Sequence, residues 1–385
     1  MIDLASNRRV FGEELQLFRE STRRFLKDHA TPYRKEWSEK GVVDRVVWDK
    51  AGAQGLLCPS VPEEYGGLGL DFRYHTVVTE EMVAAEADGP GFSVHSDIVT
   101  PYLMRHGSEQ QKQKYLPECV SGNLITAIAM TEPAAGSDLK GINSRLTQAE
   151  GGHVLNGSKT FISNGQLADL IVVVCKNKHD QRLSLVLVER GMEGFSRGKN
   201  LDKLGLKAQD TSELFFDNVF IPDSNILGEL GNGLQYLTGE LPQERLSIAL
   251  SNSAAARCAI ANTVEYVQSR RAFGSAVADF QNTQFVLAEL DAEVSAMQVF
   301  IDDCIERHLQ CELSALTAAK AKLLASELNC KVVDRCVQLH GGYGFMLEYP
   351  ITRAYANARI QPIHGGTSEI MKHIIARELF SPSHG

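Results

Sequence analysis

The first part of the chain carries apolar residues at helical spacing. The residues on one face of the first predicted helix are Phe11, Leu15, Phe18, Thr22, Phe25 and Leu26. A second helical patch covers residues 77–87 and ends at Gly89-Pro90-Gly91, which cannot continue a regular helix. Residues 1–123 are therefore predicted to form an N-terminal helical domain.

The pattern changes between residues 124 and 230. Runs of β-branched, apolar or aromatic residues at 171–174, 183–188 and 214–216 are bounded by polar and turn-forming residues, which is typical of strands. Gly151-Gly152 and Asn156-Gly157 indicate tight turns between strands. This segment is predicted to be a middle β domain.

Residues 231–385 are expected to be helical again. Ala- and Leu-rich stretches cover 245–270, 281–309 and 313–339, and a glycine-rich break follows at 341–344. The order of helices, strands and helices indicates a mostly α protein of the α+β class. Strands and helices do not alternate, and no G-x-G-x-x-G lies between a strand and a helix, so a Rossmann fold is not expected.

Composition narrows the ligand classes. The net charge is −9, from 39 basic and 48 acidic residues, which argues against broad binding to nucleic acid or to a membrane surface. No apolar run is long enough for a membrane span, and the start has no secretory apolar region. The eight cysteines form no C-x-x-C pair, so we expect reduced core thiols, and no histidine spacing indicates a metal site.

Two stretches could hold an anion or a planar ring, and each has a second explanation. The small-residue loop at 129–141, with the hydroxyls of Thr131 and Ser137, would let backbone N–H groups approach such a ligand, or would be a plain surface turn. Phe161, two residues before Ser163 at a predicted strand end, would pack on a planar cofactor, or would be a core residue.

Two further stretches lie in the C-terminal part. His340-Gly341-Gly342 is similar to an esterase oxyanion loop, but that chemistry also needs a G-x-S-x-G turn. The segments 91–95 and 366–370 both lack its final glycine, so a hydrolase is disfavoured. Arg270, at a predicted helix end, would be a solvated cap or a phosphate contact.

Taken together, these stretches resemble the acyl-CoA dehydrogenase family from Phe11 to Glu378. The segments 61–69 and 129–141 match family motifs, as does the pattern Gln338-x-x-Gly341-Gly342-x-Gly344-Phe345-x-x-Glu348-x-x-x-x-Arg353-x-x-x-Asn357. Within the family the chain is most similar to the long-chain type, on the segments 240–246 and 359–367.

The resemblance implies a fold and an activity. It implies an N-terminal helical domain at 1–123, a β-barrel-like middle domain at 124–230 and a C-terminal four-helix bundle at 231–385. It further implies an FAD-dependent enzyme that oxidises a long-chain or bulky acyl-CoA to the trans-2-enoyl-CoA, as in fatty-acid β-oxidation. The expected partners are an electron-transfer flavoprotein as acceptor and three further copies in a homotetramer.

The resemblance also implies where the catalytic base lies. Many members carry a glutamate just before a Gly-Thr pair near the C-terminus, and Gly365 occupies that position here. Long-chain members carry the base on an earlier helix, in a motif that matches Gln243-Glu244-Arg245. From the residues alone, Glu244 would be a surface carboxylate near a helix start, with Pro242 in the first turn. The resemblance instead makes Glu244 the expected base, and burial would raise its pKa toward neutrality. The Gly365 N–H is expected to stabilise the enolate oxygen.

The remaining site residues are carried over from the family motifs. Those expected to bind FAD are Ile128, Ala129, Met130, Thr131, Gly136, Ser137, Phe161, Ile162, Ser163, Arg270, Gln281, Gln338, Leu339, His340, Gly341, Gly342, Thr367, Ser368 and Glu369. Those expected to bind substrate are Pro90, Gly91, Ser137, Pro242, Gln243, Arg245, Gly365 and Gly366. Arg270, Gln281 and 338–342 match contacts made across a subunit interface. Pro90-Gly91 matches a feature that deepens the acyl pocket, and His364 stands where related members usually have Tyr.

Alternatives stay open at this point. On the same fold, the chain could act on a carrier-protein-bound acyl group or be a flavin monooxygenase, although such relatives often lack the base or the CoA contacts. A protein of another class would bind acyl-CoA without catalysis. The expected location is a bacterial cytosol, or a mitochondrial matrix if a leader has been removed.

Overall fold

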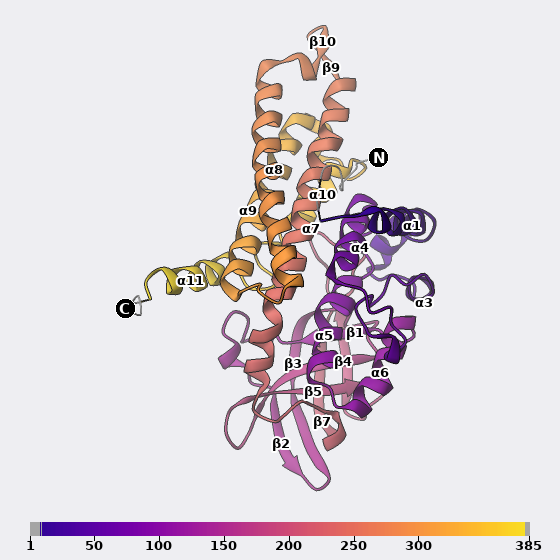
Figure 1. Ribbon diagram of the computed structural model, residues 1–385, viewed down its shortest axis with the longest axis vertical. Coiled ribbons are helices and arrows are strands. Elements are labelled where there is room, and N and C mark those ends of the chain that lie inside the picture. The colour runs from indigo at the N-terminus through magenta and orange to yellow at the C-terminus, as the bar shows by residue number, and fades with distance from the viewer. Residues whose placement is uncertain (1–7, 9, 382–385) are drawn as a thin grey trace.

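The computed structural model describes residue 8 and residues 10–381. Its N-terminal part is helical, and the helices lie beside the sheet (Figure 1). They are α1 (Glu13–His29), α2 (Arg34–Lys40), α3 (Val46–Ala53), α4 (Phe72–Ala84), α5 (Thr100–His106) and α6 (Glu109–Ser121). Helix α6 begins with a capping box between Ser108 and Gln111. After the break at 89–91, a π-helix covers Val94–Val99, and such turns are frequent at functional sites.

The middle part is a sheet. Its strands are β1 (Thr126–Ala129), β2 (Arg145–Ala149), β3 (Gly152–Ser163), β4 (Leu170–Asn177), β5 (Leu183–Glu189), β6 (Phe195–Asn200), β7 (Thr211–Pro222) and β8 (Ile226–Leu227). They pair in the order β6-β7-β3-β2-β4-β5-β8, with β1 parallel to β4. Across the described residues this path does not close, so the expected barrel-like domain is a sheet domain without a closed barrel.

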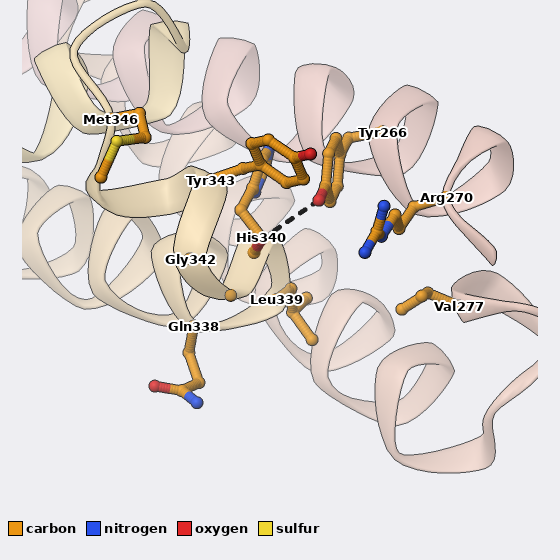
Figure 2. A pocket seen from close by; sticks show the side chains of 10 residues that line it. Tyr266, Arg270, Val277, Gln338, Leu339, His340, Gly342, Tyr343 and Met346 are labelled. Carbon is orange, nitrogen blue, oxygen red and sulfur yellow. Dashed lines mark hydrogen bonds between the residues drawn. The ribbon is translucent and has the colours of Figure 1, made fainter. Parts of the chain in front are cut away.

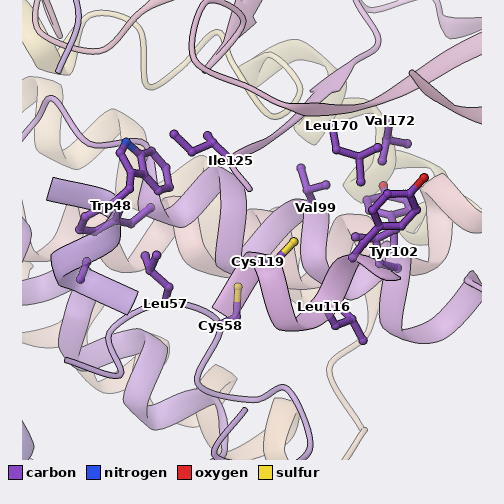
Figure 3. Packing of buried hydrophobic residues seen from close by; sticks show 14 of the residues in the cluster. Trp48, Leu57, Cys58, Val99, Tyr102, Leu116, Cys119, Ile125, Leu170 and Val172 are labelled. Carbon is purple, nitrogen blue, oxygen red and sulfur yellow. The ribbon is translucent and has the colours of Figure 1, made fainter. Parts of the chain in front are cut away.

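The N-terminal helices and the sheet share one apolar core. Figure 3 shows Tyr102 of α5 beside Leu170 and Val172 of β4, and Trp48 of α3 beside Ile125 at the other end of the same cluster. The intervening residues of β4, Ile171 and Val173, belong to a second cluster on the other face of the sheet. Every residue of β4 from 170 to 175 is apolar and buried, which fits a strand that is covered on both faces. The apolar run at 171–174 predicts the strand.

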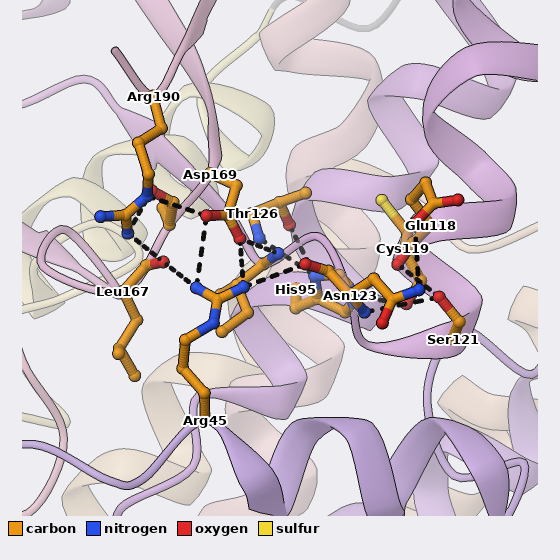
Figure 4. Close-up of polar contacts among 12 residues, drawn as sticks. Arg45, His95, Glu118, Cys119, Ser121, Asn123, Thr126, Leu167, Asp169 and Arg190 are labelled. Atoms are coloured by element: carbon orange, nitrogen blue, oxygen red, sulfur yellow. Dashed lines mark hydrogen bonds and ion pairs between the residues drawn. The ribbon is translucent and has the colours of Figure 1, made fainter.

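Ion pairs fix the helices against the edge of this core (Figure 4). Arg45, just before α3, donates to the carboxylate of Asp169 at 2.6 Å and to the carbonyls of Asn123 and Leu167 at 2.9 Å. Asp169 also accepts from Arg190 at 2.8 Å. The contact joins α3 to the start of β4. Of the eight cysteines, none is in a disulfide, and Cys311, in contrast to the expected core thiols, is exposed.

The C-terminal part contains three long helices. They are α7 (Gly233–Ser269), α8 (Gln281–Leu309) and α9 (Ala315–His340), and the shorter α10 (Pro350–Ala358) and α11 (Ser368–Leu379) pack against α9. Figure 1 shows α7 and α8 rising side by side to the hairpin of β9 (Arg271–Ala272) and β10 (Ser275–Ala276), while α11 extends away from the rest. The glycine-rich break is a short 3-10 helix, Gly341–Phe345.

Helix α7 begins earlier than the sequence indicated. Pro242 was expected in a first turn, but α7 starts at Gly233 and Pro242 lies inside it. Because proline has no N–H, the carbonyl of Thr238 loses its partner in the helix ladder. Among the described helices, none combines the length and apolar character that crossing a membrane requires.

Candidate active site

A cavity of about 540 Å³ lies where the sheet domain meets α7 and the C-terminal segment. Its lining is mainly apolar, and α7 contributes one carboxylate to it, that of Glu244. The other residues from α7 are Ser247, Ile248 and Ser251. Phe161 and Ser163 of β3 also line it, as do residues 201–206 and 209 and His364. The remaining lining residues are Thr79, Ser93, Val94, Ile98, Thr211, Ala356, Arg359, Ile360 and Ile363. An apolar cavity with a few convergent polar groups is the usual form of a small-molecule site.

Glu244 has the properties of a general base. Its Oε2 atom is buried and has no hydrogen-bond partner. Burial raises the pKa of the Glu244 carboxyl to about 7, and the neighbouring charge of Arg245 only partly opposes that shift. A carboxylate with a pKa near neutrality and a free oxygen in a cavity can accept a proton from a ligand.

Gly365 lies opposite this carboxylate. Its φ is +63°, and a Cβ placed on it would lie 3.9 Å from Glu244 Oε1 and 2.2 Å from Ile248 Cδ1. A side chain at position 365 is therefore excluded twice, by the backbone conformation and by Ile248. The structure thus brings together the two residues that were expected to act in catalysis.

Buried cations surround the glycine pair. Lys322 of α9 donates from Nζ to the carbonyl of Gly366 at 2.8 Å, and burial, followed by the charge of Arg245, lowers the pKa of Lys322 to about 8. The Arg245 side chain is also buried, and its Nε has no partner. The Lys322 hydrogen bond ties the loop 365–366 to α9.

Contacts to the π-helix fix this turn of α7. Gln243 donates from Nε2 to the Asp97 carbonyl at 2.7 Å, and Arg105 donates to Gln243 Oε1 at 3.2 Å. The Asp97 carboxylate in turn pairs with His75 at 2.7 Å and accepts from Ser93 at 2.8 Å. Gln243 therefore positions Glu244 and does not line the cavity itself.

Phe161 is placed to contact a ligand. It is 67% exposed, with a φ of +60°, and it lines the cavity together with Ser163. The alternative that Phe161 is a core residue is therefore wrong. Exposed aromatic rings in cavities stack on planar groups, and a serine hydroxyl can donate a hydrogen bond. This part of the cavity fits the ring system of a flavin.

The loop 129–141 lies outside this cavity. Its anchor is Glu132, which pairs with buried Lys159 at 2.8 Å and accepts from the backbone N–H groups of Asn143 and Ser144. Gly136 and Ser137 are exposed, and neither they nor Thr131 are among the cavity residues. Thr367 caps α11 by accepting from the N–H of Ile370, and the segment 367–369 also lies outside the cavity.

The remaining expected FAD contacts line a different cavity of about 500 Å³. Figure 2 shows Tyr266 of α7, and Arg270 directly after this helix, beside His340 and Tyr343, with the Tyr266 hydroxyl donating to the His340 carbonyl at 3.1 Å. Gln338, Leu339, Gly341 and Gly342 also line it, and Gln281 does not. Arg270 follows Glu244 by 26 residues of helix, about 39 Å at 1.5 Å per residue. Within one chain, the FAD contacts expected in the Glu244 cavity and those in the Arg270 cavity therefore lie far apart.

Pro90 and Gly91 line a third cavity, of about 370 Å³, next to that of Glu244. A Cβ on Gly91 would lie 1.9 Å from Asn164 Oδ1, and Asn164 donates to the Gly91 carbonyl at 3.1 Å. Glycine is thus required for this close approach.

Sequence reasoning missed Ile248 and Lys322. Ile248 stands one turn after Glu244, so helical spacing from the expected base could have found it. Lys322 is fully buried in an Ala-rich stretch, and no sequence signal separates it from an exposed lysine. Within residue 8 and residues 10–381, no group of three or more metal-binding side chains is gathered.

Family models match almost the whole chain. The N-terminal, middle and C-terminal domain models of acyl-CoA dehydrogenases match residues 12–123, 127–219 and 231–380. The mitochondrial long-chain specific acyl-CoA dehydrogenase of Rattus norvegicus is 47% identical over 381 residues, covering 98% of this chain and 89% of that protein. The corresponding Sus scrofa protein is 48% identical, and the match covers 97% of this chain and 88% of that protein.

Solved structures agree. An acyl-CoA dehydrogenase from Geobacillus kaustophilus superposes with a TM-score of 0.95 and 45% identity, covering 97% of this chain and all of that one. An acyl-CoA dehydrogenase from Bacillus anthracis, solved with FAD, superposes with a TM-score of 0.90 and 30% identity. The match covers 96% of this chain and 67% of that one.

Proposed function

This chain belongs to the acyl-CoA dehydrogenase family, and from that premise we propose that it oxidises a long-chain acyl-CoA to the trans-2-enoyl-CoA with Glu244 as the base. Enzymes of this family depend on FAD. The observation that carries the proposal is the free, buried oxygen of Glu244, opposite Gly365 in a cavity that fits a flavin.

The residues present have a role for each part of the reaction. The α-proton of a thioester is only weakly acidic, so its removal needs a desolvated base that is correctly positioned. The Glu244 carboxylate would be that base. Negative charge then develops on the thioester oxygen, and the backbone N–H of Gly365 would stabilise it. When bound, FAD would supply the acceptor for the hydride that leaves the β-carbon. Phe161 and Ser163 would hold its ring system, and buried Arg245 would add positive charge on the substrate side.

Arg270, Gln281 and the segment 338–342 would serve the FAD of a second subunit. The separation of about 39 Å along α7 supports this assignment, since it exceeds the reach of one FAD molecule. A homotetramer and an electron-transfer flavoprotein as acceptor belong to the same proposal. The segments 128–131, 136–137 and 367–369 would contact FAD, and Ser137 also the CoA part. The compartment stays a prediction, and the relatives above carry "mitochondrial" in their names.

Anaerobic titration of the purified flavoprotein with saturated acyl-CoAs of graded length tests the proposal. Long-chain esters are expected to bleach the flavin. In Glu244→Gln the bleaching rate should fall by about a hundredfold to ten-thousandfold with FAD still bound, because only the base is lost. Glu306→Gln, at an exposed position of α8 outside the cavity, is the matched control and should keep bleaching.

Other outcomes separate the alternatives. Undiminished bleaching in Glu244→Gln would show that another group is the base. Flavin that no acyl-CoA reduces would favour a non-catalytic binding protein. Bleaching only by an acyl group on a carrier protein would assign the substrate to that carrier.

A further inference from the structure

The cavity of Glu244 and the cavity of Gly91 follow one face of α7. The α7 residues that line the first are Glu244, Ser247, Ile248 and Ser251, and those that line the second are Ser251, Ala255, Cys258, Ala259 and Asn262. This three- and four-residue spacing marks a single helix face. Thr79, Ser93, Val94, Leu206 and Gln209 line both cavities. From Glu244 to Asn262 the face is 18 residues long, about 27 Å.

The second cavity contains hydrogen-bond acceptors without partners. Asn329 of α9 is 2% exposed, and its Oδ1 atom has no hydrogen-bond partner. Asp88 accepts from Asn357 through Oδ2 at 2.8 Å, and its Oδ1 is also buried and without a partner. Buried polar atoms are nearly always paired in folded proteins, so two free acceptors in one cavity are available to a ligand group that donates.

A network fixes the orientation of Asn329. Asn252 donates from Nδ2 to the Ile248 carbonyl and to Gln361 Oε1, both at 2.8 Å, so its Oδ1 is left to accept. Asn329 Nδ2 donates to that oxygen at 2.9 Å. The free atom of Asn329 is therefore the carbonyl oxygen, which can only accept.

We propose that the acyl group this enzyme prefers carries a hydroxyl in its distal half, which donates to Asn329 Oδ1 or Asp88 Oδ1. The proposal rests on the proposed function, because it treats the Gly91 cavity as the continuation of the acyl site. A carboxylate at this place is disfavoured, since it would bring a second negative charge beside Asp88.

The position of the hydroxyl follows from the helix. Asn329 meets Asn252, which is eight residues beyond Glu244, or about 12 Å along α7. An extended carbon chain with bonds of about 1.5 Å and angles near 111° advances about 1.25 Å per bond. About ten bonds beyond the α-carbon, near carbon 12, a hydroxyl would therefore reach Asn329.

The test compares octadecanoyl-CoA with 12-hydroxyoctadecanoyl-CoA on the holoenzyme. We expect kcat/KM to be about tenfold higher for the hydroxy ester, since its O–H is paired and both acceptors are otherwise desolvated without a partner. The same preference should appear in Kd for Glu244→Gln, in which turnover is expected to be at least about a hundredfold slower. A ratio of one or less in either measurement overturns the proposal.

Variants assign the acceptors. Asn329→Leu and Asp88→Leu are each tested, and at least one should lower the hydroxy-to-plain ratio by about tenfold while octadecanoyl-CoA is still oxidised. Asn262→Leu is the matched control, because its side chain lies beyond the reach of an 18-carbon chain. An unchanged ratio in both variants overturns the assignment. If neither ester bleaches the flavin, the dehydrogenase function fails, and the Kd comparison still decides the hydroxyl preference.

Discussion

At the residue scale, the site depends on one carboxyl group without a counter-ion. The Glu244 Oε2 has no partner, and burial brings the pKa of this carboxyl to about 7. A base acts only when unprotonated, so a pKa near the working pH combines sufficient basicity with sufficient ionisation. A carboxylate such as Asp169 could not serve, because Arg45 and Arg190 donate to its two oxygens and leave neither free.

This pKa predicts a pH dependence. Below pH 7 the Glu244 carboxyl is protonated, so the bleaching rate constant for a limiting acyl-CoA should rise about tenfold per pH unit and level off above about pH 7. Stopped-flow measurements between pH 5.5 and 9 test this. A flat profile across that range would contradict the assignment of the base.

Arg245 offers a matched control for the profile. Its positive charge lowers the pKa of Glu244, in opposition to the larger effect of burial. In Arg245→Met that charge is gone, so the midpoint of the profile should move to higher pH. A midpoint that stays in place would mean that a different group is titrating.

At the element scale, one turn of α7 and the loop 365–366 together form the surface that we propose to be catalytic. The sequence predicted a helix over 245–270, and the structure extends it back to Gly233, so that Glu244 lies well inside a helix. Ile248 fills the space that a side chain at position 365 would need. Ile248 therefore prevents any side chain, including that of an alternative base, at position 365.

Gly365→Ala tests this packing. The new methyl group would lie 2.2 Å from Ile248 Cδ1, and alanine is strained at a φ of +63°. We expect kcat/KM to fall at least about tenfold, consistent with about 1–3 kcal/mol of strain. Ile248→Ala should restore part of the activity of that variant, because it removes the clash and leaves the φ strain. Additive losses in the double variant would contradict the contact.

At the scale of the whole molecule, one chain does not bring its expected cofactor contacts together. The cavity of Glu244 and the cavity of Arg270 are separated by about 39 Å along α7. The long helices and the hairpin of β9 and β10 extend beyond the rest of the fold (Figure 1). Such an arrangement suits a site that two copies complete.

Subunit complementation tests this arrangement. Glu244→Gln subunits lack the base, and Arg270→Glu subunits should fail to hold FAD, so each alone should be inactive. Co-expressed subunits should regain about a quarter of wild-type activity, since half of the sites have Glu244 and half of those face an intact Arg270. A site contained in one chain would give no recovery. A double variant, Glu244→Gln with Arg270→Glu, paired with Glu244→Gln, is the inactive control.

The order of the helices and strands and the candidate catalytic residues follow from local sequence patterns. Periodicity and composition gave the order of helices, sheet and helices, because helix and strand spacing are local properties of the chain. Family motifs indicated Glu244 and Gly365 as candidate catalytic residues, because each motif consists of residues that are neighbours in the sequence. The π-helix at Val94–Val99 and the start of α7 at Gly233 were not visible, because both depend on packing against distant elements.

Only the tertiary structure decided what surrounds these residues. Burial shifts the pKa of Glu244 and of Lys322, and burial depends on which segments pack over a residue. Phe161 could have been a core residue by its sequence, and the fold exposes it in the cavity instead. The free acceptors of Asn329 and Asp88 arise from segments 241 residues apart, and no local pattern predicts that two such atoms meet in one cavity.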